Sequence, residues 1–275
     1  MDILGYSFFQ NALLGSLFAS ILCAMVGTYI VTRRLVFISG GITHASFGGV
    51  GLGVFWGLNP VLSAMVFAVL SAFGVQFLSH KSDIREDSAI ALFWVFGMSV
   101  GIICCFLSPG FMPDLTAFLF GSILAIGFAD IALLAVLTFL AAVIFLFAYR
   151  MILSVAFDVE FSRSQNLPVT AIEYIMMGLI AMTIVSVLRM VGIVLAISLL
   201  TVPQMTANLF TYKFKRIIVY SMLIGWIDCL VGLFFSYYFN VPSGAAIIFS
   251  GIVIYALARL AKYFYLRFSR SVAVS

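Results

Sequence analysis

The chain has 275 residues, of which 64% are hydrophobic and only 9% are charged, and its formal net charge is +4. A water-soluble domain needs about a quarter of its residues charged, so this composition excludes one and indicates a polytopic membrane protein. Runs such as 133–147 are apolar on every side, which excludes a membrane β-barrel and predicts an all-α bundle in a single transmembrane domain, residues 1–275.

Nine apolar stretches are long enough to cross about 30 Å of hydrocarbon as helices. We expect the first to be a true span rather than a cleaved signal peptide, because few basic residues precede it. Residues 115–126 are a further candidate for a dip into the membrane interface. The expected spans are 9–31, two within 35–79 separated by a turn at 57–60, 88–107, 130–149, 171–188, 190–210, 217–239 and 245–265.

The positions of the basic residues predict the orientation in the membrane, because lysine and arginine collect on cytoplasmic loops. With these spans, 13 of the 14 lysines and arginines lie on or beside cytoplasmic loops, and only Arg189 does not. The amino terminus is then outside and the carboxyl terminus is cytoplasmic. Arg189 lies either in an external turn or in a broken helix, so we expect eight or nine spans.

The sequence offers few residues for catalysis, for binding nucleic acid or for cysteine pairing. The sequence has no GxxxxGK[ST] or HExxH motif, so an enzyme is the poorer hypothesis. The net charge is explained by membrane orientation, and nucleic-acid binding is not expected. The four cysteines lie in apolar runs without paired spacing and predict neither a disulfide framework nor a zinc site.

Three polar residues on three expected spans share a similar depth. His44 lies about 15 Å beyond Arg34 along a helix, Asp228 about 18 Å beyond Arg216, and Gln204 about 14 Å before Lys213. An ionisable side chain near the midplane is a functional hypothesis by default, and imidazole with carboxylate suits a divalent metal.

Structural roles stay open for the same three residues. His44 can cap a carbonyl of a neighbouring helix, and Asp228 can bond to serine or threonine on an adjacent span. Gln204 adjoins the helix breaker Pro203, and contact with a substrate is the less favoured alternative there. Around His44, the pair Gly49 and Gly53 indicates close helix packing rather than a role in a pathway.

The segment 151–168 is too polar to span and is expected to be cytoplasmic. It contains Asp158, Glu160 and Arg163, and it is the longest candidate for contact with a soluble partner.

As a set, four stretches resemble a known family, the permease subunits of the zinc, manganese and iron ATP-binding cassette importers, or ABC-3 family. The first expected span ends in an arginine pair, as in that family. Residues 37–49 are similar to the second-span signature, in which an aspartate and a histidine four residues apart precede a glycine-rich run. VGIVLAISLLTVPQMTA, at 191–207, looks like VGxLLxxALLxxPAxxA, and FDVEFSRSQNLPV, at 157–169, is similar to the coupling segment DxExAxxxGI.

The resemblance implies that His44 handles metal along a translocation path, but the family's aspartate is replaced by Gly40. A helix places residues four apart on one face, so the family's pair can hold one ion together. Another acid is needed here, and Asp228 is the candidate by depth. Gln204, a neutral amide, is a further candidate for contact with the metal. In the coupling segment Phe161 and Asn166 replace the usual alanine and glycine, and Asn tolerates the left-handed conformation that glycine provides.

The resemblance also implies an architecture and partners. It predicts a multi-pass subunit of a bacterial plasma membrane, paired with a second copy of itself in membrane lipid and served by an external metal-binding protein. Cytoplasmic ATPase subunits would dock on a short coupling helix through Asp158, Glu160, Arg163 and Asn166. The divalent metal is the substrate, and no cofactor is expected to stay bound. The alternatives are an importer subunit for a siderophore or other small molecule, and a non-transport membrane scaffold.

Overall fold

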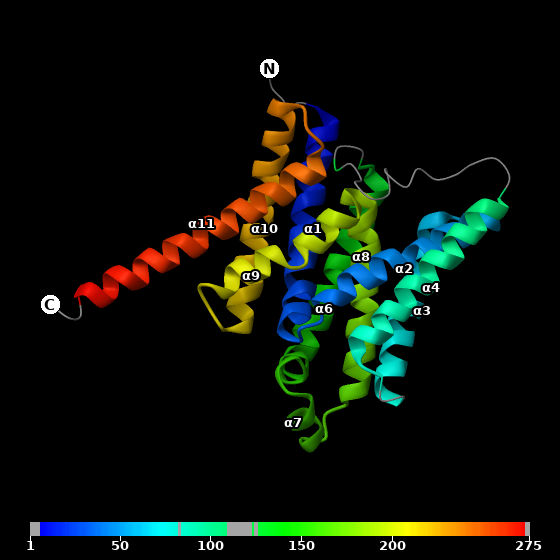
Figure 1. The fold of residues 1–275 in the computed structure, drawn as a ribbon, viewed down its shortest axis with the longest axis horizontal. Coiled ribbons are helices and arrows are strands. Elements are labelled where there is room, and N and C mark those ends of the chain that lie inside the picture. The colour runs from blue at the N-terminus through cyan, green and yellow to red at the C-terminus, as the bar shows by residue number, and fades with distance from the viewer. Residues whose placement is uncertain (1–5, 82–83, 109–122, 124–125, 273–275) are drawn as a thin grey trace.

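A computed structural model describes residues 6–81, 84–108, 123 and 126–272, the last seven by their backbone alone. Every long element in these ranges is an α-helix, as the apolar runs predict (Figure 1). The helices are α1 (Ser7–Thr32), α2 (Val36–Phe55), α3 (Pro60–Lys81), α4 (Glu86–Leu107), α6 (Phe128–Phe157), α7 (Val159–Ser164), α8 (Val169–Leu199), α9 (Val202–Asn208), α10 (Phe214–Phe239) and α11 (Ser243–Val272). The proposed interfacial dip at 115–126 lies almost wholly outside the described residues.

Seven stretches of the described chain are long and apolar enough to cross a membrane. One of them is the continuous run Val169–Asn208, and α2 is not among the seven. Adding α2, whose 20 residues also match the membrane thickness, gives eight spans, and dividing the long run at a break gives nine. Both numbers expected from the sequence are therefore compatible with these helices.

The break in the long run is at Gly192, whose φ of 78° and ψ of 174° belong to a region that essentially only glycine occupies. In Figure 1 the ribbon of α8 bends before it leads to α9. Helix α8 thus crosses the expected boundary between the spans 171–188 and 190–210, and its kink lies three residues after Arg189. Polar Arg189 does not end the helix, because its guanidinium pairs with Asp130 at the start of α6, 2.9 Å away.

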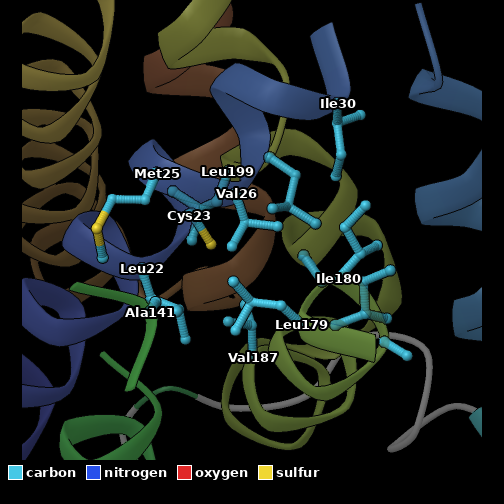
Figure 2. Packing of buried hydrophobic residues seen from close by; sticks show 14 of the residues in the cluster. Leu22, Cys23, Met25, Val26, Ile30, Ala141, Leu179, Ile180, Val187 and Leu199 are labelled. Atoms are coloured by element: carbon cyan, nitrogen blue, oxygen red, sulfur yellow. The ribbon is translucent and has the colours of Figure 1, made fainter. Parts of the chain in front are cut away.

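Helix α1 lies at the centre of the bundle and is the source of much of the apolar core. Its side chains Leu22 and Val26 meet Ala141 of α6 and Leu179 of α8 (Figure 2). All four are buried. In a membrane this close packing, rather than exclusion of water, holds the helices together, and it gives polar side chains on α1 and α8 fixed positions.

Helices α2, α3 and α4 form a second group that packs through glycines. A Cβ on Gly51 would lie 2.5 Å from the carbonyl oxygen of Gly101 in α4, and one on Gly49 would lie 2.4 Å from that of Ser63 in α3. The predicted packing role of the Gly49 and Gly53 pair is confirmed. The predicted turn at 57–60 is also present, with Asn59 accepting a hydrogen bond from the Val61 amide that starts α3.

Helix α6 extends beyond Tyr149, where the fifth span was expected to end. Helix α6 continues past Arg150 to Phe157, because 151–157 is apolar apart from Ser154 and contains no helix breaker. The expected cytoplasmic segment 151–168 therefore begins as a helix, and only its second half forms α7 and the following turn. In the same way, the expected loop 80–87 begins later, since His80 and Lys81 are the last residues of α3.

Candidate functional site

His44 lies midway along α2 and is partly buried. Its imidazole stacks on the indole of Trp94 in α4, with ring centroids 4.4 Å apart and an interplanar angle of 4°. The glycines of α2 bring α4 close enough for this contact. Stacking fixes the plane of the imidazole and leaves the ring nitrogens at its edge, where a metal ligand needs them.

Gly40, one turn before His44, has space where the resembled family carries an acid. A Cβ at this position would meet only Ile197 Cδ1, at an ordinary contact distance of 3.8 Å. Crowding at the Cβ position therefore does not account for the glycine.

Gln204 is fully buried in α9, and its side-chain amide forms hydrogen bonds with backbone carbonyls. It donates hydrogen bonds to the carbonyl of Cys23, at 2.8 Å, and to that of Leu199, at 3.2 Å. Leu199 ends α8, so Gln204 caps a carbonyl freed by the break before α9. Its Oε1 atom has no hydrogen-bond partner among the described residues.

Asp228 is the buried acid of α10, with 2% of its surface exposed. It faces α11, where a Cβ on Gly251 would lie 3.2 Å from Oδ2. The Ser250 hydroxyl donates to the backbone carbonyl of Asp228 and not to the carboxylate, and Oδ1 has no partner within the described chain. A buried carboxylate with an unpaired oxygen is costly, so it retains capacity for a cation or a proton.

The structure does not bring His44, Gln204 and Asp228 together in one chain. His44 is between α2 and α4, whereas Asp228 is between α10 and α11, on the other side of α1 (Figure 1). No group of three or more histidine, cysteine, aspartate or glutamate side chains in the described ranges is arranged to hold a metal. Individual contacts of these residues with a passing ion stay predictions.

The expected coupling segment forms the short helix α7. Asp158 is its N-cap and accepts a 2.9 Å hydrogen bond from the Phe161 amide, while Glu160 and Arg163 form an exposed ion pair at 3.0 Å. Asn166 has a φ of 54°, so the left-handed conformation expected at this position is present. Buried Ser162 ties α7 to α6 through a 2.7 Å contact with Ser154.

Sequence reasoning missed Glu173, a buried acid of α8 with three side-chain partners. It lies near the start of α8 with 3% of its side chain exposed, and its carboxylate binds an arginine, a glutamine and a histidine. The available signal was that Glu173 is the only acid in the apolar run 169–208. An acid within an apolar run is a functional hypothesis by the same reasoning that singled out Asp228.

Comparison with known proteins now decides the family. The model of the ABC 3 transport family matches residues 5–262. The chain belongs to this family. It is a multi-pass membrane subunit of an ABC 3 transporter, and not the ATPase.

Relatives of this ABC 3 subunit match it over nearly their whole lengths. It is 35% identical to an uncharacterized membrane protein of Synechocystis over 94% of this chain and 92% of the relative. It is 31% identical, with the same coverage, to the manganese transport system membrane protein MntC of Listeria monocytogenes. Among solved structures, PsaBC from Streptococcus pneumoniae in complex with Fab matches with a TM-score of 0.82 and 27% identity, covering 93% of this chain and 92% of the other.

Proposed function

We propose that this chain is the permease subunit of an ATP-driven importer for a divalent metal ion, with manganese as the first candidate. The observation that carries the proposal is the 31% identity, over nearly the whole chain, to a membrane protein of a manganese transport system. The path near His44 is exposed to one side of the membrane at a time, and two copies of the chain form the channel between them.

The end of the bundle that carries α7 is the cytoplasmic end in this proposal. Arg33 and His80 both contact Glu173 there, so the ends of α1 and α3 and the start of α8 lie together. Arg189 pairs with Asp130 where α6 begins, at the opposite end. Arg33 thus lies at the α7 end, where the orientation rule for cytoplasmic loops expects basic residues.

The partners follow from the same assignment. Helix α7 is the docking element for a cytoplasmic ATPase, since it presents the Glu160–Arg163 pair and the exposed ring of Phe161 beyond the membrane-spanning helices. An external binding protein delivers the metal. Weak, sparse ligands along the path suit transport, because the ion must also be released.

Uptake in membrane vesicles that contain the chain, its ATPase and its binding protein tests the function. The wild-type complex should import radiolabelled manganese when ATP is supplied. His44→Ala should lower uptake at least about tenfold, the scale on which loss of a metal-site group acts. Phe55→Ala, at an exposed position on the same helix, is the matched control and should leave uptake unchanged.

Two results would contradict the proposal. If wild-type vesicles accumulate an intact metal chelate but no free manganese, zinc or iron, the substrate class is wrong. If His44→Ala imports every metal at the wild-type rate, the role assigned to His44 is wrong even though the chain is a metal permease.

A further inference from the structure

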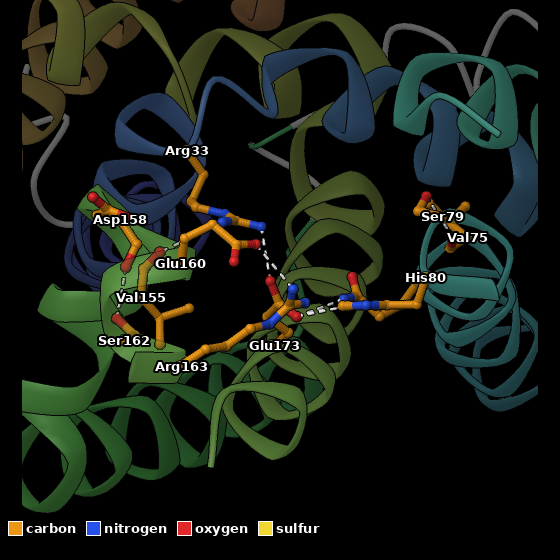
Figure 3. A network of polar contacts seen from close by, with 11 residues as sticks. Arg33, Val75, Ser79, His80, Val155, Asp158, Glu160, Ser162, Arg163 and Glu173 are labelled. Carbon is orange, nitrogen blue, oxygen red and sulfur yellow. Dashed lines mark hydrogen bonds and ion pairs between the residues drawn. The ribbon is translucent and has the colours of Figure 1, made fainter. Parts of the chain in front are cut away.

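Arg33, Gln76 and His80 all contact Glu173, and the four residues are here called the Glu173 cluster. Figure 3 shows Arg33, His80 and Glu173. Its Oε1 accepts a hydrogen bond from Arg33 Nη2 at 2.9 Å. Its Oε2 contacts Gln76 Nε2 at 3.0 Å and His80 Nε2 at 2.7 Å. One buried carboxylate is thus shared by three side chains from two other parts of the bundle.

The cluster joins helices that are far apart in sequence at the end of the bundle that carries α7. Arg33 follows α1, Gln76 and His80 are in the last turns of α3, and Glu173 is in the first turns of α8. Arg33 also donates through Nη1 to the Val155 carbonyl of α6, at 3.4 Å. If α1, α3 and α8 separated at this end, the contacts of Glu173 with Arg33, Gln76 and His80 would break.

Stability alone is a poor explanation for this cluster. Removing an ion pair from water is costly, and a well-packed apolar set of similar volume is often as stable or more stable. A polar contact between helices differs from an apolar one in two ways. It holds one arrangement of the helices specifically, and its groups can exchange partners or bind water when the helices separate. Such a contact suits helices that must adopt two arrangements.

A continuous set of contacts leads from α7 to the cluster. Ser162 of α7 is buried and contacts Ser154 of α6 through their hydroxyls, 2.7 Å apart. The next residue of α6 is Val155, whose carbonyl accepts from Arg33. A displacement of α7 therefore reaches Arg33 through two consecutive residues of α6, and reaches Glu173 through Arg33.

We propose that Glu173 is a coupling residue, and that its cluster closes the pathway at the α7 end until movement of α7 pulls Arg33 away from the carboxylate. This inference rests on the proposed transport function, because it assigns the cluster to the closed state of one gate. In the structure Arg33 contacts Glu173 and the Val155 carbonyl of α6 at once. The second state in this proposal keeps the contact with α6 and loses the one with Glu173, which gives the two discrete states that coupling requires.

Cysteine labelling tests the gate without any metal. A cavity of about 570 Å³ at this end is lined by Arg33, Phe157 and Asn208 among others, so Asn208→Cys reports access to it. The native cysteines are all buried, which keeps the background low. In inside-out vesicles of the complex, Glu173→Gln should speed labelling of the introduced thiol by a membrane-impermeant maleimide at least about fivefold, the lower range of allosteric coupling.

Three further variants separate gating from folding. Glu173→Asp keeps the charge and should label near the wild-type rate, whereas His80→Ala, at a less buried position, should speed labelling in the same direction as Glu173→Gln. Asp87→Asn breaks the exposed Arg85–Asp87 pair after α3, whose side chains are 83% and 55% exposed, and should change nothing. If the complex does not assemble with Glu173→Gln, the labelling rate of the His80→Ala complex decides whether the cluster closes the pathway.

The second readout is the number of metal ions imported per ATP hydrolysed. A coupling role predicts that Glu173→Gln lowers this ratio at least about fivefold while ATP hydrolysis continues, whereas a purely structural role lowers both rates together. Wild-type labelling and a wild-type ratio in both Glu173→Gln and His80→Ala would overturn the inference. Failure of wild-type vesicles to import any metal would contradict the proposed function and would leave the labelling test of the gate intact.

Discussion

The imidazole of His44 lies parallel to the indole of Trp94, with an interplanar angle of 4°. The contact joins α2 to α4 at the residue that the sequence marks as functional. It restricts rotation of the histidine ring about its side-chain bonds, and so restricts the direction in which its ring nitrogens point. Trp94 is therefore a positioning residue for His44.

Trp94→Leu should raise the KM for manganese uptake more than it lowers the maximal rate. Leucine fills part of the space but cannot hold the ring by stacking, which contributes about 0.5–1.5 kcal/mol. Uptake measured over a range of manganese concentrations in vesicles gives both constants. Trp56→Leu, at an exposed tryptophan just after α2, is the control, and an equal effect of the two substitutions would exclude a specific role for stacking.

Gly192→Ala should destabilise the protein by about 1–3 kcal/mol, because only glycine readily adopts its backbone conformation. Thermal unfolding of the purified subunit in detergent measures the change as a lower Tm. Gly178→Ala lies in the same helix, has helical geometry and would meet only the ring of Phe73 at 3.4 Å, so it should be close to neutral. Equal Tm values for the two variants would mean that the break does not depend on glycine.

Asp130 has two contacts that two substitutions can separate. It pairs with Arg189 at 2.9 Å and accepts a hydrogen bond from the Gly127 amide at 3.1 Å at the start of α6. Arg189→Gln removes only the ion pair, whose arginine is 48% exposed, and should cost at most about 1 kcal/mol. Asp130→Ala also removes the helix cap and should cost about 1 kcal/mol more.

Thermal unfolding of both variants tests this division. Equal losses for Arg189→Gln and Asp130→Ala would show that the ion pair, and not the cap, fixes the start of α6.

The sequence predicted most helices because their lengths follow from the membrane thickness and from breakers such as Pro60. Helix α6 runs on to Phe157, beyond the span end expected at Tyr149, since one long basic side chain does not stop a helix whose following residues stay apolar. The sequence analysis placed the break in this run at Arg189, three residues before its observed position at Gly192 in α8. The charge of Arg189 was a stronger signal than one glycine among many.

For the site, counting residues along helices gave depth in the membrane but not position around the bundle. His44 and Asp228 therefore looked like partners, although α2 and α10 lie on opposite sides of α1. Glu173 went unnoticed because its partners Arg33 and His80 are distant in sequence and were assigned to loops. Such contacts depend on how α1, α3 and α8 pack together. A local sequence pattern does not predict that packing.

Gly40→Asp should fold and should increase the apparent affinity for manganese. An aspartate there is one turn from His44 on the same face of α2, and its Cβ has an ordinary 3.8 Å contact with Ile197. A carboxylate beside an imidazole adds charge compensation for a divalent cation and slows its release, so KM and maximal rate should both fall. Uptake kinetics in vesicles measure both constants.

The adjacent glycine provides the control for space. A Cβ on Gly41 would lie 2.2 Å from Cγ2 of Ile90, so Gly41→Asp should disrupt the packing of α2 on α4 and lower the yield of folded protein. If Gly40→Asp folds as well as the wild type but leaves both kinetic constants unchanged, an ion does not pass this face of α2. The missing acid would then have to be sought elsewhere, with the unpaired carboxylate oxygen of Asp228 as the next position to test.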